Sequence, residues 1–313
     1  MDDESRIRPP EDEVIGCRGL TKRYGETFAI RELDLSVREG EVFGFLGPNG
    51  AGKTTTLRIL LGLISPSSGT ARMNGRDVPD PRGLSDVGAM VEEPVFYPWL
   101  SGKTNLRVLS QVGAPLSGPA IAGAMERTGI GASAGDKVGT YSQGMRQRLG
   151  LAAALMRRPR VLLLDEPTNG LDPAGIRDFR SILREASVEG TTVFLSSHLL
   201  TEVEHLCDRV AIVNRGRLAA VGTLDELGRD VPVVRVTVDP ADEARALELL
   251  QPLRPQREEE GVLRVTAPSG RQVAELLGRG GIYPETLSVE RPSLEDLFLQ
   301  LTEGEASRAT ARL

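Results

Sequence analysis

The sequence predicts an α/β fold with a central, mostly parallel sheet, followed by a smaller α+β domain. Two short apolar strands carry this prediction. Residues 41–46, EVFGFL, run directly into a glycine-rich turn and a helix, and residues 161–164, VLLL, end in two acidic residues. Near-continuous apolar runs are typical of parallel strands buried on both faces. After Leu227 the composition shifts and strand-like and helix-like segments alternate, which predicts a second, small domain.

The composition indicates a globular protein and limits the partners that the chain can bind. Charged residues make up 26% of the sequence and the net charge is −6, so we expect no nucleic-acid partner. No apolar run approaches the roughly 18 residues of a membrane-spanning helix, and we expect no such span. Residues 1–13 are acidic and polar, unlike a signal peptide, and are predicted to be the disordered lead of a cytoplasmic protein. Cys17 and Cys207 lie outside any disulfide or zinc pattern and are expected to be core thiols.

A phosphate-binding loop is predicted between the strand at 41–46 and a helix over 55–63. Glycine allows backbone N–H groups of such a loop to turn toward phosphate oxygens, and the following helix points the positive end of its dipole at them. Lys53 is expected to reach the β- and γ-phosphates of ATP, and the Thr54 hydroxyl to bind the Mg²⁺ that bridges them. The loop fits G-x-x-x-x-G-K-[ST], and the residues expected to bind ATP are Gly47, Pro48, Asn49, Gly50, Ala51, Gly52, Lys53, Thr54 and Thr55.

A pair of carboxylates follows the apolar strand at 161–164. Ligands of open α/β sheets bind at the carboxyl ends of the strands, which places Asp165 and Glu166 at the predicted site. Asp165 is expected to hold Mg²⁺ through water, and Glu166 to act as the general base that polarises the attacking water. An acidic pair after an apolar strand is common by chance. The phosphate loop upstream, at a plausible spacing, favours the functional interpretation.

A Ser-x-Gly signature opens a helix just before the acidic strand, within residues 141–150, YSQGMRQRLG. Together with the phosphate loop and the acidic pair, this segment resembles the ATP-binding cassette (ABC) family over about residues 14–227. The resemblance implies a P-loop NTPase cassette with a central mostly parallel sheet, an antiparallel β subdomain and a helical subdomain at about 94–158. It also implies an ATPase that uses ATP and Mg²⁺ as a transporter subunit, with the cassette spanning 14–229.

The resemblance implies that two such subunits face each other head to tail, with each ATP between the phosphate loop of one and the signature of the other. By this analogy Ser142 and Gly144, with Gln143 between them, contact the γ-phosphate bound to a second copy of the chain. Asp172, in NGLDP, matches the loop that touches the partner subunit near its nucleotide. An ordinary N-cap role would account for Ser142, but not for the whole array of motifs.

Three further positions match functional residues of the family. Tyr24 resembles the aromatic residue that stacks on adenine, although simple packing is the commoner role of such a tyrosine. His198, after the strand TTVFLSS, matches the histidine that contacts the γ-phosphate and aligns the water, so we expect it to be catalytic with Glu166. Glu92 stands where the family usually has glutamine and is expected to bind Mg²⁺ through water in the ATP site. His205 has no such match and is expected to be structural.

The signature departs from the common pattern of the family. After the serine the family has Gly-Gly-Gln, whereas this chain has Gln143, Gly144 and Met145. One of the two glycines is therefore missing, and with it the backbone freedom of that position. Every residue expected to contact the phosphates, the Mg²⁺ or the attacking water directly is retained, so we interpret the chain as an active variant of the family.

Aromatic residues cluster after the strand VGAMV, in a chain in which they make up only 4%. Phe96, Tyr97 and Trp99 all fall within residues 93–104. In the family this stretch enters the helical subdomain, whose groove receives cytoplasmic helices of the membrane subunits. Packing inside the subdomain is an equally good explanation, and both can hold. The resemblance implies integral membrane permease subunits as partners and a peripheral location at the cytoplasmic face of the cell membrane.

The second domain is predicted over 230–303, ahead of a disordered tail at 304–313. Strands are predicted at VVRVTVD, GVLRVTAP and TLSVERP, and helices at ADEARALELL, SGRQVAELLGRG and SLEDLFLQLT. Ser293 and Asp296 form a capping-box signal for the last helix. No catalytic constellation is visible here. The ending resembles the extension of daunorubicin- and bacitracin-type exporter ATPases, which implies a role in regulating or stabilising the dimer.

We interpret the chain as the ATPase subunit that powers export of a drug, antibiotic or other hydrophobic compound through a separate permease. This interpretation rests on YSQGM and the C-terminal extension, and an importer ATPase is the nearest alternative. A soluble cassette ATPase of DNA repair or of the ribosome is disfavoured, because residues 55–141 contain no heptad run and the chain has a single phosphate loop. Glu166 and His198 disfavour a nucleotide sensor that does not hydrolyse ATP.

Overall fold

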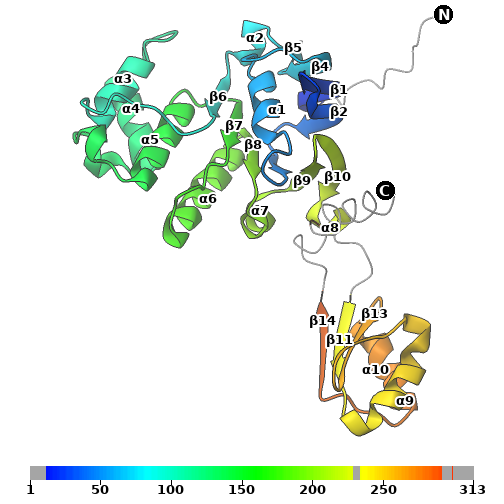
Figure 1. The fold of residues 1–313 in the computed structure, drawn as a ribbon. Coiled ribbons are helices and arrows are strands. Elements are labelled where there is room, and N and C mark those ends of the chain that lie inside the picture. Colours follow the sequence, from blue (N-terminus) through cyan, green and yellow to red (C-terminus); the bar gives the residue numbers. More distant parts are fainter. Residues whose placement is uncertain (1–11, 228–232, 291–297, 299–313) are drawn as a thin grey trace, which may run out of the picture. The chain divides into compact units, whose positions relative to one another are not determined.

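The chain divides into two compact units, residues 1–221 and 222–313 (Figure 1). Each unit has its own hydrophobic core. The computed structural model describes residues 12–227, 233–290 and 298. Four predictions lie wholly or mostly outside these residues: the lead at 1–13, the domain boundary at 229–230, the last helix with Ser293 and Asp296, and the tail at 304–313.

The first unit contains a six-stranded sheet, whose strands are β3 (Val42–Leu46), β6 (Val87–Met90), β7 (Val161–Asp165), β8 (Thr192–Ser197), β9 (Arg209–Asn214) and β10 (Arg217–Thr223). They are arranged in the order β10–β9–β3–β8–β7–β6, and β9, β3, β8, β7 and β6 run parallel to one another. Every residue of β3, β7 and β8 is buried, which explains the apolar runs VFGFL, VLLL and VFL within them. The predicted α/β class is confirmed, and the carboxyl ends of these strands share one edge of the sheet.

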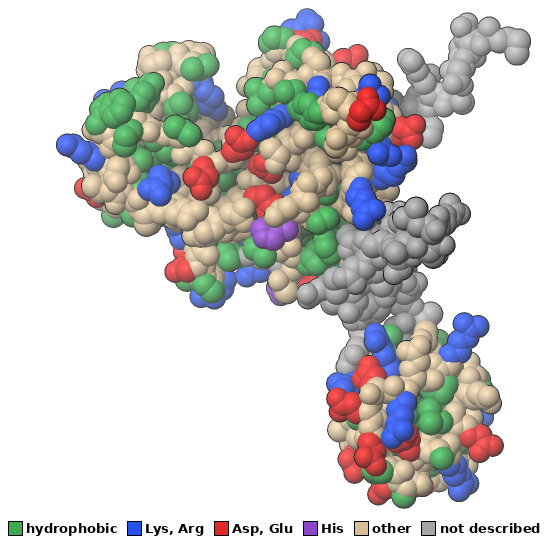
Figure 2. All heavy atoms as spheres, viewed as in Figure 1, with side chains coloured by type: hydrophobic (Ala, Val, Ile, Leu, Met, Phe, Trp, Pro, Cys, Tyr) green, Lys and Arg blue, Asp and Glu red, His purple; other side chains and the backbone are tan. Residues whose placement is uncertain are grey.

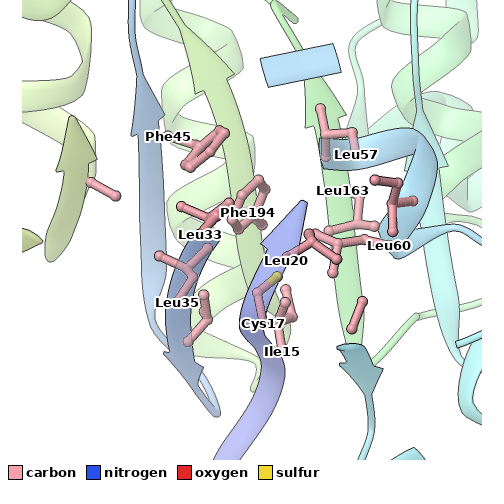
Figure 3. Close-up of a cluster of buried hydrophobic side chains, with 14 of the residues drawn as sticks. Ile15, Cys17, Leu20, Leu33, Leu35, Phe45, Leu57, Leu60, Leu163 and Phe194 are labelled. Atoms are coloured by element: carbon pink, nitrogen blue, oxygen red, sulfur yellow. The ribbon is translucent and has the colours of Figure 1, made fainter. Parts of the chain in front are cut away.

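An antiparallel sheet and α1 (Lys53–Leu60) share a core with one face of this sheet. Figure 3 shows Leu20, Leu33, Leu60, Phe45 and Phe194 converging there from five different elements. Side chains of both sheets and of the helix after the phosphate loop thus exclude water together, which fixes the position of that loop. The antiparallel sheet has the order β2–β1–β4–β5, with strands β1 (Glu13–Tyr24), β2 (Thr27–Arg38), β4 (Ser68–Met73) and β5 (Arg76–Asp77), and the short helix α2 (Pro81–Leu84) follows it.

The opposite face of the parallel sheet is covered by α6 (Pro173–Val188) and α7 (Leu200–Leu206). Gly44 of β3 faces Val203 and Cys207, where a Cβ atom would have no room. Cys207 and Cys17 are both free and buried, so the prediction of core thiols is confirmed. Burial raises the pKa of the Cys17 thiol to about 12, and it also raises the pKa of Cys207.

Three helices form a separate cluster within the first unit: α3 (Gly102–Leu109), α4 (Gly118–Arg127) and α5 (Gln143–Leu155), with 3₁₀ turns at Gly131–Ser133 and Val138–Thr140. Each helix begins after a serine, Ser101, Ser117 or Ser142, whose hydroxyl accepts a backbone N–H of the first turn. Leu106 and Met125 lie in the small core between the helices. Within the described part of the chain, no helix is long and apolar enough to cross a membrane.

The described part of the second unit contains a four-stranded antiparallel sheet in the order β12–β13–β11–β14, together with the helices α9 and α10. Strand β12 was not predicted, because its sequence QREE is fully exposed and has no apolar alternation. Three strands and two helices agree with the predicted α+β pattern. The elements are α8 (Leu224–Leu227), β11 (Val233–Thr237), α9 (Glu243–Leu250), β12 (Gln256–Glu259), β13 (Val262–Thr266), α10 (Gly270–Arg279) and β14 (Thr286–Glu290), with 3₁₀ turns at Pro240–Asp242 and Gln251–Leu253.

Candidate nucleotide site at the carboxyl edge of the sheet

The loop between β3 and α1 is held by its own backbone and by its neighbours. The Ala51 N–H donates to the Pro48 carbonyl at 3.1 Å, and the Ala51 carbonyl accepts the Gly216 N–H at 3.1 Å. Gly52 caps α1 with φ of 103°, and a Cβ atom there would overlap the Ala29 carbonyl oxygen. Only glycine fits both conditions. The loop therefore brings backbone N–H groups and the positive end of the α1 dipole to one place, which is suited to an anion.

Lys53 is the cation of this site. Its side chain is only 6% exposed, and its Nζ lies 3.1 Å from Glu166 Oε1. The same Nζ donates to the carbonyls of Gly47 and Pro48, at 2.7 and 3.3 Å. A buried ammonium needs such partners, because desolvation is costly for an unpaired charge.

Asp165, at the end of β7, is buried between two hydroxyl groups. Thr54 Oγ1 donates to its Oδ2 at 2.7 Å, and Ser196 Oγ donates to its Oδ1 at 2.6 Å. Thr54 and Asp165 were predicted to act on the same metal ion, and the structure places them in contact. Ser196 was not predicted. A hydroxyl near the end of the buried strand TTVFLSS was the signal that could have identified it.

Glu166 connects the loop side of the site to His198. Its Oε2 lies 2.7 Å from His198 Nδ1, while its other oxygen faces Lys53. The backbone of Glu166 has a φ of 47°, which is uncommon for a residue with a side chain. Its N–H donates to Ser196 Oγ at 3.0 Å and to the Ser196 carbonyl at 3.2 Å, which holds that conformation. Unusual backbone geometry of this kind clusters at functional sites.

Two predicted residues lie outside this group of contacts. Tyr24 is half-exposed at the end of β1, with Lys22 Nζ 5.0 Å from the centre of its ring. Glu92 follows β6, has a φ of 64°, and forms an ion pair with Arg58 of α1. Arg58 is a second residue that the motifs did not indicate, since nothing in the sequence pairs it with Glu92.

The signature residues and Asp172 form a second group, at the amino-terminal ends of α5 and α6. Ser142 Oγ accepts the Met145 N–H at 3.2 Å, and Asp172 Oδ1 accepts the Gly175 N–H at 2.7 Å. Both residues therefore cap their own helices, as a single serine or aspartate would in any protein. Two helix ends with positive dipoles lie together here, because signature residues contact the loop that precedes Asp172.

Comparisons with known proteins identify the family. A family model described as ABC transporter matches residues 30–169, and one described as an AAA domain matches residues 135–204. The ABC transporter ATP-binding protein YdbJ of Bacillus subtilis is 38% identical over 297 residues, which cover 93% of this chain and 96% of that protein. This chain belongs to the ABC transporter ATP-binding proteins.

Other ABC relatives match over nearly the full length. The bacitracin transport ATP-binding protein BcrA of Enterococcus faecalis is 36% identical, over 93% of this chain and 97% of that protein. The daunorubicin resistance ATP-binding protein DrrA3 of Streptomyces coeruleorubidus is also 36% identical, over 93% and 96%. A solved structure titled as the ATP-binding subunit of an ABC transporter superposes with a TM-score of 0.63 at 28% identity, covering 69% of this chain and 92% of that chain. The resemblance and the cassette fold are confirmed, and this ABC protein is an ATPase that binds ATP.

Proposed function

We propose that this ABC ATPase is the nucleotide-binding subunit of an exporter and drives a separate membrane permease for a drug, antibiotic or other hydrophobic compound. The observation that carries the proposal is the continuous set of contacts from Thr54 through Asp165 and Ser196 to Glu166 and His198. It supports hydrolysis and not binding alone. Relatives named for bacitracin transport and daunorubicin resistance support the exported class, and their similarity extends over the second unit.

In this proposal the loop residues 47–55 bind the phosphates of ATP through backbone N–H groups, and Lys53 binds the β- and γ-phosphates. Tyr24 is half-exposed and is proposed to stack on the adenine. The hydroxyl of Thr54 and the carboxylate of Asp165 are hard oxygen donors 2.7 Å apart, which fits Mg²⁺. Glu92 is proposed to bind the same ion through water. When bound, Mg²⁺ supplies charge that neutralises the phosphate oxygens.

Glu166 is proposed to be the general base that takes a proton from the attacking water. One oxygen of its carboxylate is hydrogen-bonded to His198, and its backbone N–H is held by Ser196. The orientation of the Glu166 carboxylate is therefore set before ATP binds. His198 is proposed to contact the γ-phosphate and to align the water. Lys53 neutralises the other Glu166 oxygen, and phosphate oxygens would compete with Glu166 for that ammonium group.

Two copies are proposed to close head to tail around two ATP molecules. The positive end of the α5 dipole, with Ser142, Gln143 and Gly144, would then face the γ-phosphate bound by the partner. Asp172 would lie at the same interface, because the signature contacts the loop before it. ATP binding closes the dimer and hydrolysis allows it to reopen.

The permease is proposed to dock on exposed apolar side chains of the helical cluster. Val95 is 91% exposed and Trp99 65%, whereas Phe96 packs against the small core of the helices. Val108 and Val112 add further exposed apolar surface at and just after α3. Figure 2 shows hydrophobic side chains gathered over this part of the molecule. A site on these residues would hold the protein at the cytoplasmic face of the membrane.

Replacing Glu166 with Gln tests the catalytic part of the proposal. We expect ATP to remain bound and turnover to fall by about 10²-fold or more, because an amide cannot take the proton of water. A closed dimer should accumulate, which size-exclusion chromatography with ATP can detect. Hydrolysis at the wild-type rate would remove Glu166 as the base.

The transport part is tested by purifying this variant from detergent-solubilised membranes. A polytopic membrane protein should co-purify with it. Ribosomes or DNA in its place would contradict the transporter proposal, and an obligate periplasmic binding protein would point to import.

A further inference from the structure

Gln143, the second residue of the signature, packs on a loop of its own chain. A Cβ atom placed on Gly170 would overlap Gln143 Cδ and Nε2 and would lie 2.5 Å from Oε1. All three atoms surround the same point at similar distances, so the amide group presents its flat face to Gly170. Gly170 itself has a φ of 78°. Any side chain at this position would therefore be strained and would also displace Gln143.

The neighbouring residues make the same connection. A Cβ atom on Gly144 would lie 3.3 Å from Leu171 Cδ2, so two consecutive signature residues pack on two consecutive loop residues. Across the described residues, no hydrogen bond to the Gln143 side chain is formed, and the contact is one of shape. It joins the first turn of α5 to the segment just before Asp172, the N-cap of α6.

This loop leads directly back to Glu166. The Leu171 N–H donates to the Thr168 carbonyl at 3.1 Å, and the Asn169 N–H donates to the Glu166 carbonyl at 3.2 Å. Two linked turns therefore separate Gly170 from Glu166. Gly170 lies within these turns, so a displacement of Gly170 would be passed along them to the residue that also contacts His198 and Lys53.

We propose that Gln143 is a positioning residue that couples the two ATP sites of the dimer. The proposal rests on the head-to-tail arrangement proposed above, in which α5 faces the partner's ATP while Glu166 acts on the ATP of its own subunit. Contact of α5 with the partner's γ-phosphate then moves the Gly170 loop through Gln143 and sets the position of Glu166. Each site becomes active when the other is filled. A glycine at position 143 lacks this contact.

Variants of Gln143 in the full-length chain separate coupling from folding. Glycine has no side chain and the side chain of asparagine is too short to reach Gly170, so Gln143→Gly and Gln143→Asn remove the contact. Methionine is about as long as glutamine, so Gln143→Met keeps the packing on Gly170. We expect the Hill coefficient of ATP hydrolysis to exceed 1 in the wild type and in the Met variant, and to fall toward 1 in the Gly and Asn variants. Thermal unfolding followed by circular dichroism should place all four proteins close together, because Gln143 is exposed.

A double-mutant cycle tests the contact itself. Gly170→Ala should lower turnover, because its Cβ displaces the Gln143 amide as well as straining the backbone. In the Gln143→Gly background only the strain remains, so the loss should be smaller by about 2- to 10-fold. An equal fall in turnover in both backgrounds would show that the contact between Gln143 and Gly170 does not affect catalysis.

The outcomes also distinguish this coupling from the proposed dimer. If the wild type forms no ATP-dependent dimer in sedimentation experiments, the head-to-tail proposal fails and the coupling fails with it. If the wild type dimerises but its Hill coefficient is 1, or if Gln143→Gly leaves a Hill coefficient above 1 unchanged, only the coupling is overturned.

Discussion

At the scale of single residues, Ser196 serves two functional groups at once. Its hydroxyl donates to Asp165 Oδ1 and accepts the backbone N–H of Glu166. A hydroxyl has one hydrogen and two lone pairs, so it can satisfy both groups. One small side chain therefore sets the direction of the carboxylate proposed for Mg²⁺ and the backbone of the proposed base.

Replacing Ser196 with Ala should destabilise the chain and weaken its response to Mg²⁺. Asp165 is buried and would lose one of its two hydroxyl donors, which costs about 1–3 kcal/mol. Urea unfolding measures the stability, and hydrolysis against Mg²⁺ concentration measures the second effect. Ser36→Ala is the matched control, because the buried Ser36 Oγ has no hydrogen-bond partner among the described residues. Equal urea midpoints for the two variants would contradict the role of Ser196.

Changes at Glu92 and Arg58 should shift the Mg²⁺ requirement in opposite directions. Both side chains of this ion pair are partly exposed, so breaking it should change the stability by less than about 1 kcal/mol. Glu92→Gln removes a negative charge near the proposed ion and should raise the Mg²⁺ concentration for half-maximal hydrolysis. Arg58→Gln frees the carboxylate of Glu92 and should lower it. Shifts in the same direction would show that the pair does not influence the metal site.

At the scale of elements, the same N-cap begins helices with different roles. Ser117 and Ser142 each accept an N–H of the first turn of their helix, and each replacement by Ala should cost about 0.5–2 kcal/mol of stability. Only Ser142 is proposed to face a phosphate. Ser142→Ala should therefore reduce hydrolysis by about tenfold or more, while Ser117→Ala should leave it near the wild-type rate. An equal effect of both variants on hydrolysis would reduce Ser142 to a capping residue.

The elements that the sequence predicts best are those whose burial is uniform. Strands β3 and β7 are buried at every position, and their apolar runs predicted both their type and their direction. Strand β12 is exposed at every position. Its sequence therefore has no alternation of apolar and polar residues that would predict a strand. Ser196 and Arg58 escaped prediction for another reason. Their roles depend on residues 31 and 34 positions away in the chain, which only the folded sheet brings close.

At the scale of the whole molecule, the proposed active site is divided between two copies of the chain. One subunit holds the phosphate loop, the acidic pair and His198, while the group of Ser142 and Asp172 faces outward at the ends of α5 and α6. A variant with a broken loop and a variant with a broken signature should therefore complement each other.

Mixing Lys53→Ala with Ser142→Ala tests this division. Each variant alone should be nearly inactive, because both sites of its homodimer carry the defect. A mixed dimer contains one site built from the intact loop and the intact signature, so hydrolysis should be greatest at equal amounts of the two proteins. The control is the hydrolysis rate of each variant alone at the same total protein concentration. No recovery at any ratio would count against a head-to-tail dimer.

Because both native thiols are buried, an introduced cysteine can be labelled selectively in the native chain. Maleimides and methanethiosulfonates react with thiolates, and burial keeps the pKa of Cys17 near 12 and also raises that of Cys207. A cysteine introduced at exposed Val188 should therefore take up a spin label or fluorophore far faster than either native residue. Distances between labels on two subunits can then follow opening and closing without first removing the natural cysteines from the core.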